Sequence, residues 1–183
     1  MESWFQGCID FFWKIWPVTE DRGRNMKQLS VKRERFFWEE IKEICAASRM
    51  EESKQYYQHG ITSVYSHSLH VAYESCRIAE SFHLQVDYHA LIRGAFLHDY
   101  FLYDWHDREH KHKRPHGFYH PGAALKNAME DFTLSEIEQD IIKKHMFPLT
   151  AVPPSCLEAW IVCAADKWCS ARETVQRRKE AVL

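Results

Sequence analysis

The chain has 183 residues, of which 45% are hydrophobic and 27% are charged, and its formal net charge is −2. This length suffices for one domain with a sizeable core. The near-neutral charge excludes a general electrostatic affinity for nucleic acid or for acidic membrane surfaces.

Six cysteines are scattered along the chain, and no two of them form a C-x-x-C pair. A small secreted domain held together by disulfides would be shorter and richer in cysteine. We therefore expect a reduced protein of the cytoplasm.

The first thirty residues are expected to stand apart from the rest. Met1–Trp16 is rich in Trp and Phe, and Pro17–Asn25 is polar, aperiodic and contains Pro and Gly, as linkers do. The aromatic segment lacks the features of a signal peptide and is too short to cross a bilayer as a helix. We expect it to pack on the domain or on a second copy, as a homodimer contact. An interfacial membrane anchor is the alternative, but Lys14 is its one basic residue. The predicted division is residues 1–30 for this segment and its linker, and 31–183 for a helical domain.

From Val31 onward, apolar residues recur with the period of an α-helix. A first amphipathic helix carries Phe37, Ile41 and Ile44 on one face. A short helix over Met50–Gln58 is expected to follow it.

The next helix is expected to run from about Ser63 to Phe82. Its apolar face includes Val71 and Phe82 and also carries His67, whereas His70 points elsewhere. A histidine on this face is predicted to project into the centre of the domain.

A further helix is predicted over Asp87–Leu102, with His98 and Asp99 at its inward-facing C-terminal end. The polar stretch Tyr103–Gly117 breaks every periodicity and is expected to be a long loop. The helical pattern resumes over Tyr119–Asp131.

Two capping boxes, Thr133–Glu136 and Ser155–Glu158, are expected to open the last two helices. The first of these helices leads to His145 on its inward face, and the second places Asp166 on the same face as Val162. A carboxylate on an apolar face is costly unless it is paired or binds a metal. Because no strand alternation appears, the predicted fold class is all-α, a compact helical bundle around a central site.

Five of these predicted helices, or their ends, carry an inward-facing histidine or aspartate. A lone inward histidine is more often a hydrogen-bonded core residue than a ligand. Imidazoles and carboxylates that converge from several helices are, however, the usual ligands of a divalent cation in a helical bundle. The candidate metal ligands are His67, His98, Asp99, His120, His145 and Asp166.

These motifs resemble those of the HD-domain superfamily of metal-dependent phosphohydrolases, in the subgroup with the order H…HD…H…H…D. The segment HSLHVA is similar to the first-histidine helix of that family, AFLHDY to its HD doublet and VCAADKW to its final aspartate helix. HGFYHPGAALKNA and IIKKHMFPLT are similar to the third-histidine and fourth-histidine segments of members with two metals. The resemblance covers about residues 58–171. The doublet is followed by Tyr-Phe rather than Ile-Gly, and the Gly-Tyr-Pro signature of the cyclic-dinucleotide phosphodiesterases is missing after His145.

The resemblance implies one or two divalent metal ions, with Mn, Fe, Mg, Co and Ni all compatible. It implies that Asp99 bridges the two ions and orients the attacking water. The first ion would be held by His67, His98, Asp99 and Asp166, and the second by His120 and His145 together with Asp99.

The expected activity is hydrolysis of a phosphate monoester or diester by a metal-activated water, on a nucleotide or another small phosphorylated metabolite. Two residues are candidates for substrate binding: His116, four residues before His120 at the entrance to the site, and Lys167, next to a candidate ligand. Lys167, like Lys144 and Arg93, can equally be an ordinary surface residue.

Two other functions remain open. Some proteins that resemble this superfamily hold two irons and oxidise their substrates with oxygen, and the six-ligand set permits this because imidazole and carboxylate also suit iron. The second is a non-catalytic module that senses a nucleotide, although such a module has no need of six costly inward polar groups.

Overall fold

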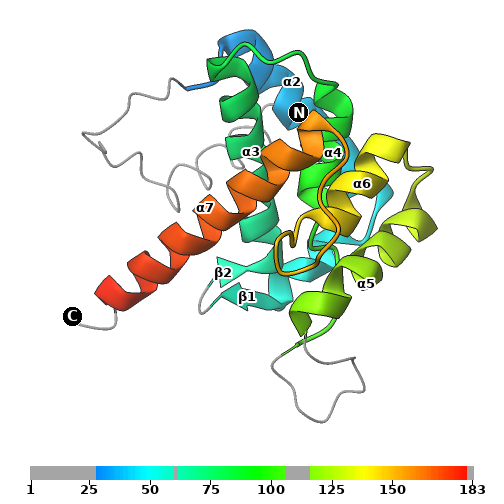
Figure 1. Cartoon of the computed structure of the whole chain (residues 1–183), viewed down its shortest axis with the longest axis vertical. Coiled ribbons are helices and arrows are strands. Elements are labelled where there is room, and N and C mark those ends of the chain that lie inside the picture. The colour runs from blue at the N-terminus through cyan, green and yellow to red at the C-terminus, as the bar shows by residue number, and fades with distance from the viewer. Residues whose placement is uncertain (1–27, 60–61, 106–115, 181–183) are drawn as a thin grey trace.

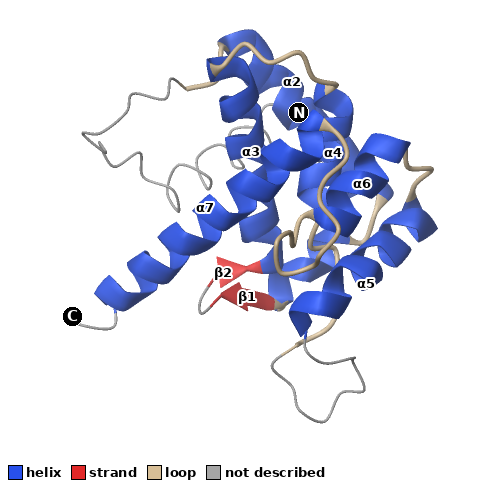
Figure 2. Ribbon diagram, viewed as in Figure 1, coloured by secondary structure: helices blue, strands red, loops and turns tan. Residues whose placement is uncertain are grey.

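The computed structural model describes residues 28–59, 62–105 and 116–180, which form one helical bundle with a small hairpin at one end (Figures 1 and 2). The all-α class is confirmed, since the strands in this part of the chain form a single two-stranded antiparallel hairpin. The elements are α2 (Val31–Ala47), the 3₁₀ helix η1 (Met50–Gln55), β1 (Tyr57–His59), β2 (Thr62–Ser63), α3 (Val64–Ser81), α4 (Tyr88–Leu97), α5 (His116–Asp131), α6 (Glu136–Lys144) and α7 (Leu157–Glu180).

Helix α3 lies at the centre and packs against α4 on one side and α7 on the other (Figure 1). Every residue from Val64 to Cys76 is buried, so the helix has no solvent-facing side over this length. A helix buried all round must satisfy its polar side chains inside the protein. Ser75 does so locally, because its hydroxyl donates to the carbonyl oxygen of Val71 at 2.7 Å.

Aromatic side chains join α2, α3 and α4. The ring of Phe37 on α2 meets that of Tyr73 on α3 edge to face at 5.3 Å, and Tyr65 of α3 meets Phe96 of α4 in the same way at 5.4 Å. All four side chains are buried. Burying a side chain of this size stabilises the fold by about 2–3 kcal/mol, so these contacts fix the helices that carry two of the candidate ligand segments.

Two helix boundaries differ from the prediction. Helix α4 ends at Leu97 rather than Leu102, because Tyr100 N–H turns back to the Leu97 carbonyl at 3.1 Å. Helix α5 begins at His116 rather than Tyr119. His116 is therefore the first residue of a helix and not part of a loop.

The capping boxes also differ from the prediction. The one that opens α6 pairs Ser135 with Glu138, since Glu138 N–H donates to the Ser135 hydroxyl at 3.3 Å and Ser135 N–H donates to the Glu138 carboxylate at 2.6 Å. The predicted pairing within Thr133–Glu136 was therefore out of register. Glu138 also pairs with Arg93 of α4, which ties this cap to the core.

The predicted capping box at Ser155–Glu158 does not form. The backbone N–H of Ser155 donates to Asp140 at 2.6 Å, and the Glu158 carboxylate accepts from the backbone N–H of Asp87 at 2.9 Å. A capping box would pair the Ser155 N–H with the Glu158 carboxylate, but each of these groups binds a residue of another segment instead.

Two smaller expectations were wrong. Phe82 is 65% exposed, because it follows the end of α3 instead of continuing its buried face. The predicted helix over Met50–Gln58 is a 3₁₀ helix that ends at Gln55, and strand β1 follows it.

Residues 1–27 lie outside the described residues, so the domain boundary after residue 30 and the dimer contact through Met1–Trp16 stay predictions. The five described cysteines are free thiols. None of the described helices combines the length and the hydropathy that crossing a membrane requires.

Gly94 of α4 packs closely against Ile141 of α6. A Cβ at this position would lie 2.6 Å from Ile141 Cδ1 and 3.1 Å from Ile141 Cβ. We expect Gly94→Ala to lower the free energy of unfolding by about 1–2 kcal/mol, because overpacking outweighs the gain in helix propensity. Gly122→Ala, on α5, is the matched control, because its Cβ would meet no atom within 4 Å. Urea unfolding of both variants tests this, and equal stability of the two would contradict it.

Candidate functional site

All six candidate ligands are buried, and they meet where α3, α4, α5, α6 and α7 approach one another. The six residues come from separate segments of the chain and form one cluster, as the sequence predicted. His67 lies near the start of α3, His98 and Asp99 follow the end of α4, His120 lies in α5, His145 follows the end of α6, and Asp166 lies in the middle of α7.

Three of the imidazoles are held in one tautomer by backbone carbonyls. A carbonyl oxygen can only accept a hydrogen bond. Nδ1 therefore carries the proton in His98, His120 and His145, and the lone pair of a neutral ring is on Nε2. This is the state in which histidine binds a metal through Nε2. The accepting carbonyls are those of Ala95 at 2.7 Å, His116 at 3.1 Å and Ile142 at 2.9 Å, respectively.

The Nε2 atoms of His120 and His145 lie 2.8 Å apart. Two lone pairs at this distance repel each other unless a proton or a metal ion lies between them. Nε2 of His98 is also buried and has no hydrogen-bond partner among the described residues. The arrangement can therefore accept a proton or a metal ion.

Asp99 faces both halves of the cluster with its two carboxylate oxygens. Oδ1 lies 3.0 Å from His120 Nε2 and 3.5 Å from His145 Nε2. Oδ2 lies 3.3 Å from His98 Nε2 and 3.8 Å from His67 Nε2. One carboxylate can thus serve two neighbouring cations.

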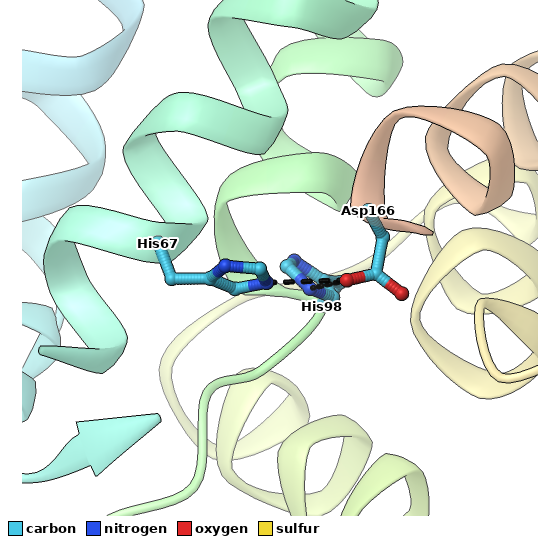
Figure 3. A group of neighbouring side chains, drawn as sticks. All are labelled: His67, His98 and Asp166. Carbon is cyan, nitrogen blue, oxygen red and sulfur yellow. Dashed lines mark hydrogen bonds and ion pairs between the residues drawn. The ribbon is translucent and has the colours of Figure 1, made fainter. Parts of the chain in front are cut away.

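Asp166 of α7 closes the other side of the site. Figure 3 shows this carboxylate pointing at the rings of His67 and His98, and its Oδ1 lies 3.1 Å and 3.8 Å from their respective Nε2 atoms. Ser170, one turn further along α7, donates its hydroxyl to the same oxygen at 3.3 Å.

Glu173 is a member of the site that the sequence analysis missed. Nδ1 of His67 lies 3.1 Å from its Oε1 and 3.2 Å from its Oε2. Because a carboxylate accepts, this contact places the proton on Nδ1 and turns Nε2 towards Asp166. The available signal was helical spacing, since Glu173 follows Asp166 by about two turns on the buried face of α7. His70 was expected to point elsewhere, but it is buried and its Nδ1 lies 3.8 Å from Glu173 Oε1.

The carboxylates of the site are ionised at neutral pH. Burial by itself raises the pKa of Asp99, but the imidazoles of His98 and His120 outweigh burial and hold it well below the ordinary value. Burial likewise raises the pKa of Asp166, and hydrogen bonding to His67 overcomes this and lowers it. Carboxylates bind metal ions in this ionised state.

Two of the imidazoles are shifted in opposite directions. Burial lowers the pKa of His145 to about 3, and neighbouring His98 adds to this effect, so the ring is neutral and able to donate a lone pair. Burial also disfavours the charged form of His67, but the carboxylates of Glu173 and Asp166 raise its pKa well above the ordinary value. The His67 side of the site therefore stabilises a positive charge.

Two groups of side chains have ligand atoms within 4.8 Å of one another and could each hold a metal ion. His98 belongs to both groups, whereas the family resemblance implied that it binds only the first metal ion. The mixed nitrogen and oxygen donors suit divalent first-row metals. The groups are His67, His98 and Asp166, and His98, Asp99 and His145.

A cavity of about 730 Å³ opens onto the cluster. This volume is in the range of small-molecule sites. Part of the wall is polar and consists of candidate ligands, and much of the rest is apolar. The apolar lining includes Trp105, Gly117, Met146, Pro148 and Leu149.

Both predicted substrate-binding residues line this cavity. The His116 ring stacks between those of Trp105 at 4.8 Å and His120 at 4.7 Å. Nζ of Lys167 donates to the His145 carbonyl oxygen at 2.7 Å and lies 3.6 Å from Asp166 Oδ2.

Two other basic side chains, whose roles the sequence left open, form ion pairs within the fold. Lys144 pairs with Asp140 and Arg93 pairs with Glu138. Neither lines the cavity, so both are assigned to the scaffold.

Comparison with models of known protein families gives a match described as the HD domain over residues 64–170. This range contains all six candidate ligands. No curated protein and no solved structure matches the chain.

Removing the charge of Glu173 should weaken metal binding. We expect Glu173→Gln to raise the dissociation constant for Mn²⁺ about 10- to 100-fold, because the carboxylate orients His67. Isothermal titration of metal into metal-stripped protein measures this.

Glu158→Gln is the matched control for that experiment. It makes the same change at another buried carboxylate of α7, one that accepts from the Asp87 backbone away from the site. Equal affinities of the two variants would contradict the role of Glu173.

Proposed function

Because the chain belongs to the HD domain family, whose members are in general metal-dependent hydrolases, we propose that it hydrolyses a phosphate monoester or diester of a nucleotide or another small metabolite. The observation that carries this proposal is the set of inward Nε2 lone pairs around the Asp99 carboxylate. The adjoining cavity supports it, because its volume suits a ligand of nucleotide size.

The six clustered side chains are the proposed metal ligands, for one or two divalent ions. The donor set is compatible with Mn, Fe, Mg, Co and Ni. A divalent ion bound there lowers the pKa of a coordinated water towards neutrality and offsets charge on phosphoryl oxygens. Asp99 is the proposed bridging ligand, since each of its oxygens faces a different pair of imidazoles.

Asp99 is also the proposed catalytic residue. Its carboxylate is buried and ionised, so it accepts a hydrogen bond from the nucleophilic water and fixes the direction of the water's lone pair. Fixing this direction favours in-line attack on phosphorus.

Lys167 and His116 are the proposed contacts to substrate. The Lys167 ammonium lines the cavity beside the ligands and attracts an anionic phosphoryl group. The His116 imidazole stacks on the ring of the candidate ligand His120 and lines the cavity, and we assign it to phosphate binding or to protonation of the leaving group. The apolar wall receives the organic part of the ester.

A panel of phosphate monoesters and diesters, assayed with each divalent metal, tests the proposed reaction. We expect metal-dependent phosphate or alcohol release, and we expect Asp99→Asn to lower kcat by at least about 100-fold. Asp140→Asn is the control, because that carboxylate pairs with Lys144 on α6 and does not line the cavity.

Failure of the metal-loaded protein on every ester would overturn the hydrolase proposal. Oxygen consumption by an iron-loaded sample would then support an oxygenase, and tight nucleotide binding without turnover would support a sensing module.

Loss of the Lys167 charge should weaken substrate binding more than chemistry. We expect Lys167→Gln, which retains a donor for the His145 carbonyl, to raise KM about 10-fold and to change kcat less. Steady-state kinetics on the best ester measures both constants. Lys143→Gln, at an exposed position of α6, provides the charge-matched control. A fall in kcat at unchanged KM would argue against a binding role.

A further inference from the structure

The outer face of α7 carries an exposed apolar stripe, on which Trp160 meets the ring of Phe147 edge to face at 5.4 Å. Trp160 and Trp168 are 46% and 50% exposed, and Leu157 and Val175 are 44% and 52% exposed. At 100° per residue, the exposed apolar side chains fall within an arc of about 80°. The stripe consists of Leu157, Trp160, Ala164, Trp168, Ala171 and Val175.

The stripe forms one contiguous exposed apolar patch. The two half-exposed indoles alone present about 200 Å², and the other four side chains bring the patch to the order of 400 Å². Patches of this size on soluble proteins are commonly interaction sites. This exposed apolar area also matches the apolar half of a standard interface, which buries about 800 Å² on each partner.

The order of large and small residues along the stripe is self-complementary. When two copies of α7 run antiparallel about a two-fold axis near position 166, residues equally distant from that position face each other. Trp168 then faces Ala164 of the second copy, and Leu157 faces Val175. Trp160 lies beside Ala171 in the same register. Trp168 is thus opposite a small residue, and Trp160, whose equidistant counterpart is Arg172, lies next to one. This alternation allows two helices to interdigitate.

The charged neighbours of the stripe do not oppose this pairing. Lys167 turns to the carbonyl oxygen of its own His145, and the Arg172 guanidinium lies 6.0 Å from the Trp168 ring. The carboxylates Asp166 and Glu173 are on the opposite, buried face of the helix. An isologous contact would therefore bury no unpaired charge from the stripe itself.

We propose that the protein forms a two-fold symmetric dimer in which the α7 stripes of two copies pack antiparallel. This contact differs from the one predicted through Met1–Trp16, and it does not depend on the proposed activity. Over the span from Leu157 to Val175 it extends for about 27 Å.

Sedimentation equilibrium of the full chain tests the dimer. We expect a dimer at micromolar concentration, and we expect Ala164→Glu to raise its dissociation constant at least about 100-fold, because two carboxylates would be buried at the axis. Thr174→Glu, an exposed position beside the stripe on the same helix, is the control and should leave the dimer intact. Circular dichroism establishes that both variants are folded.

Cysteine cross-linking in a Cys8→Ser, Cys156→Ser background tests the orientation, because the free thiol of Cys156 is next to Leu157. Leu157→Cys mixed with Val175→Cys should give a covalent dimer under mild oxidation, whereas Val175→Cys alone should not, because antiparallel packing separates the two copies of that position. A protein that is monomeric throughout, or a dimer that Ala164→Glu leaves unchanged, would overturn the proposal. In the second case, a dimer lost on Phe12→Asp would instead assign the contact to the N-terminal segment.

Discussion

The backbone carbonyls of Ala95, His116 and Ile142 determine what the centre of this protein can bind. Each accepts the Nδ1–H of a buried imidazole and so leaves the Nε2 lone pair facing inward. The carboxylates between these lone pairs are ionised, and the resulting pocket consists of acceptors with little to donate to them. Positive charge at the centre would stabilise such an arrangement. In agreement with this, Glu173 and Asp166 raise the pKa of His67 although burial opposes it, whereas burial and the neighbouring His98 lower the pKa of His145 and keep that ring neutral.

The C-terminal ends of two helices help to stabilise these buried imidazoles. His98 and His145 directly follow α4 and α6, and each ring donates to a carbonyl in the last turn of the helix that it follows. Carbonyls in that turn lack the usual partner four residues further on and carry partial negative charge. One hydrogen bond therefore helps to satisfy the helix terminus and fixes the imidazole.

The sequence was sufficient for the parts of the site that follow from local periodicity. His67, His98 and Asp166 each lie on, or just beyond, an apolar stripe, and the prediction that they converge is confirmed by their geometry. Errors arose where tertiary partners compete with local ones. Glu158 and Ser155 have the spacing of a capping box, yet Asp87 and Asp140 bind them instead.

Glu173 escaped prediction for a related reason. One glutamate in a long polar helix end resembles a solvated residue, and its burial depends on α3 lying beside α7. The distance from Asp166 along α7 places both carboxylates on the inner face, and the same periodicity places Trp160 and Trp168 on the outer face. Helix α7 thus orients two carboxylates of the site through one side, while its other side presents the apolar stripe. A partner packed along the outer side would restrict how far α7 can shift, and so would restrict the positions of Asp166 and Glu173 relative to His67.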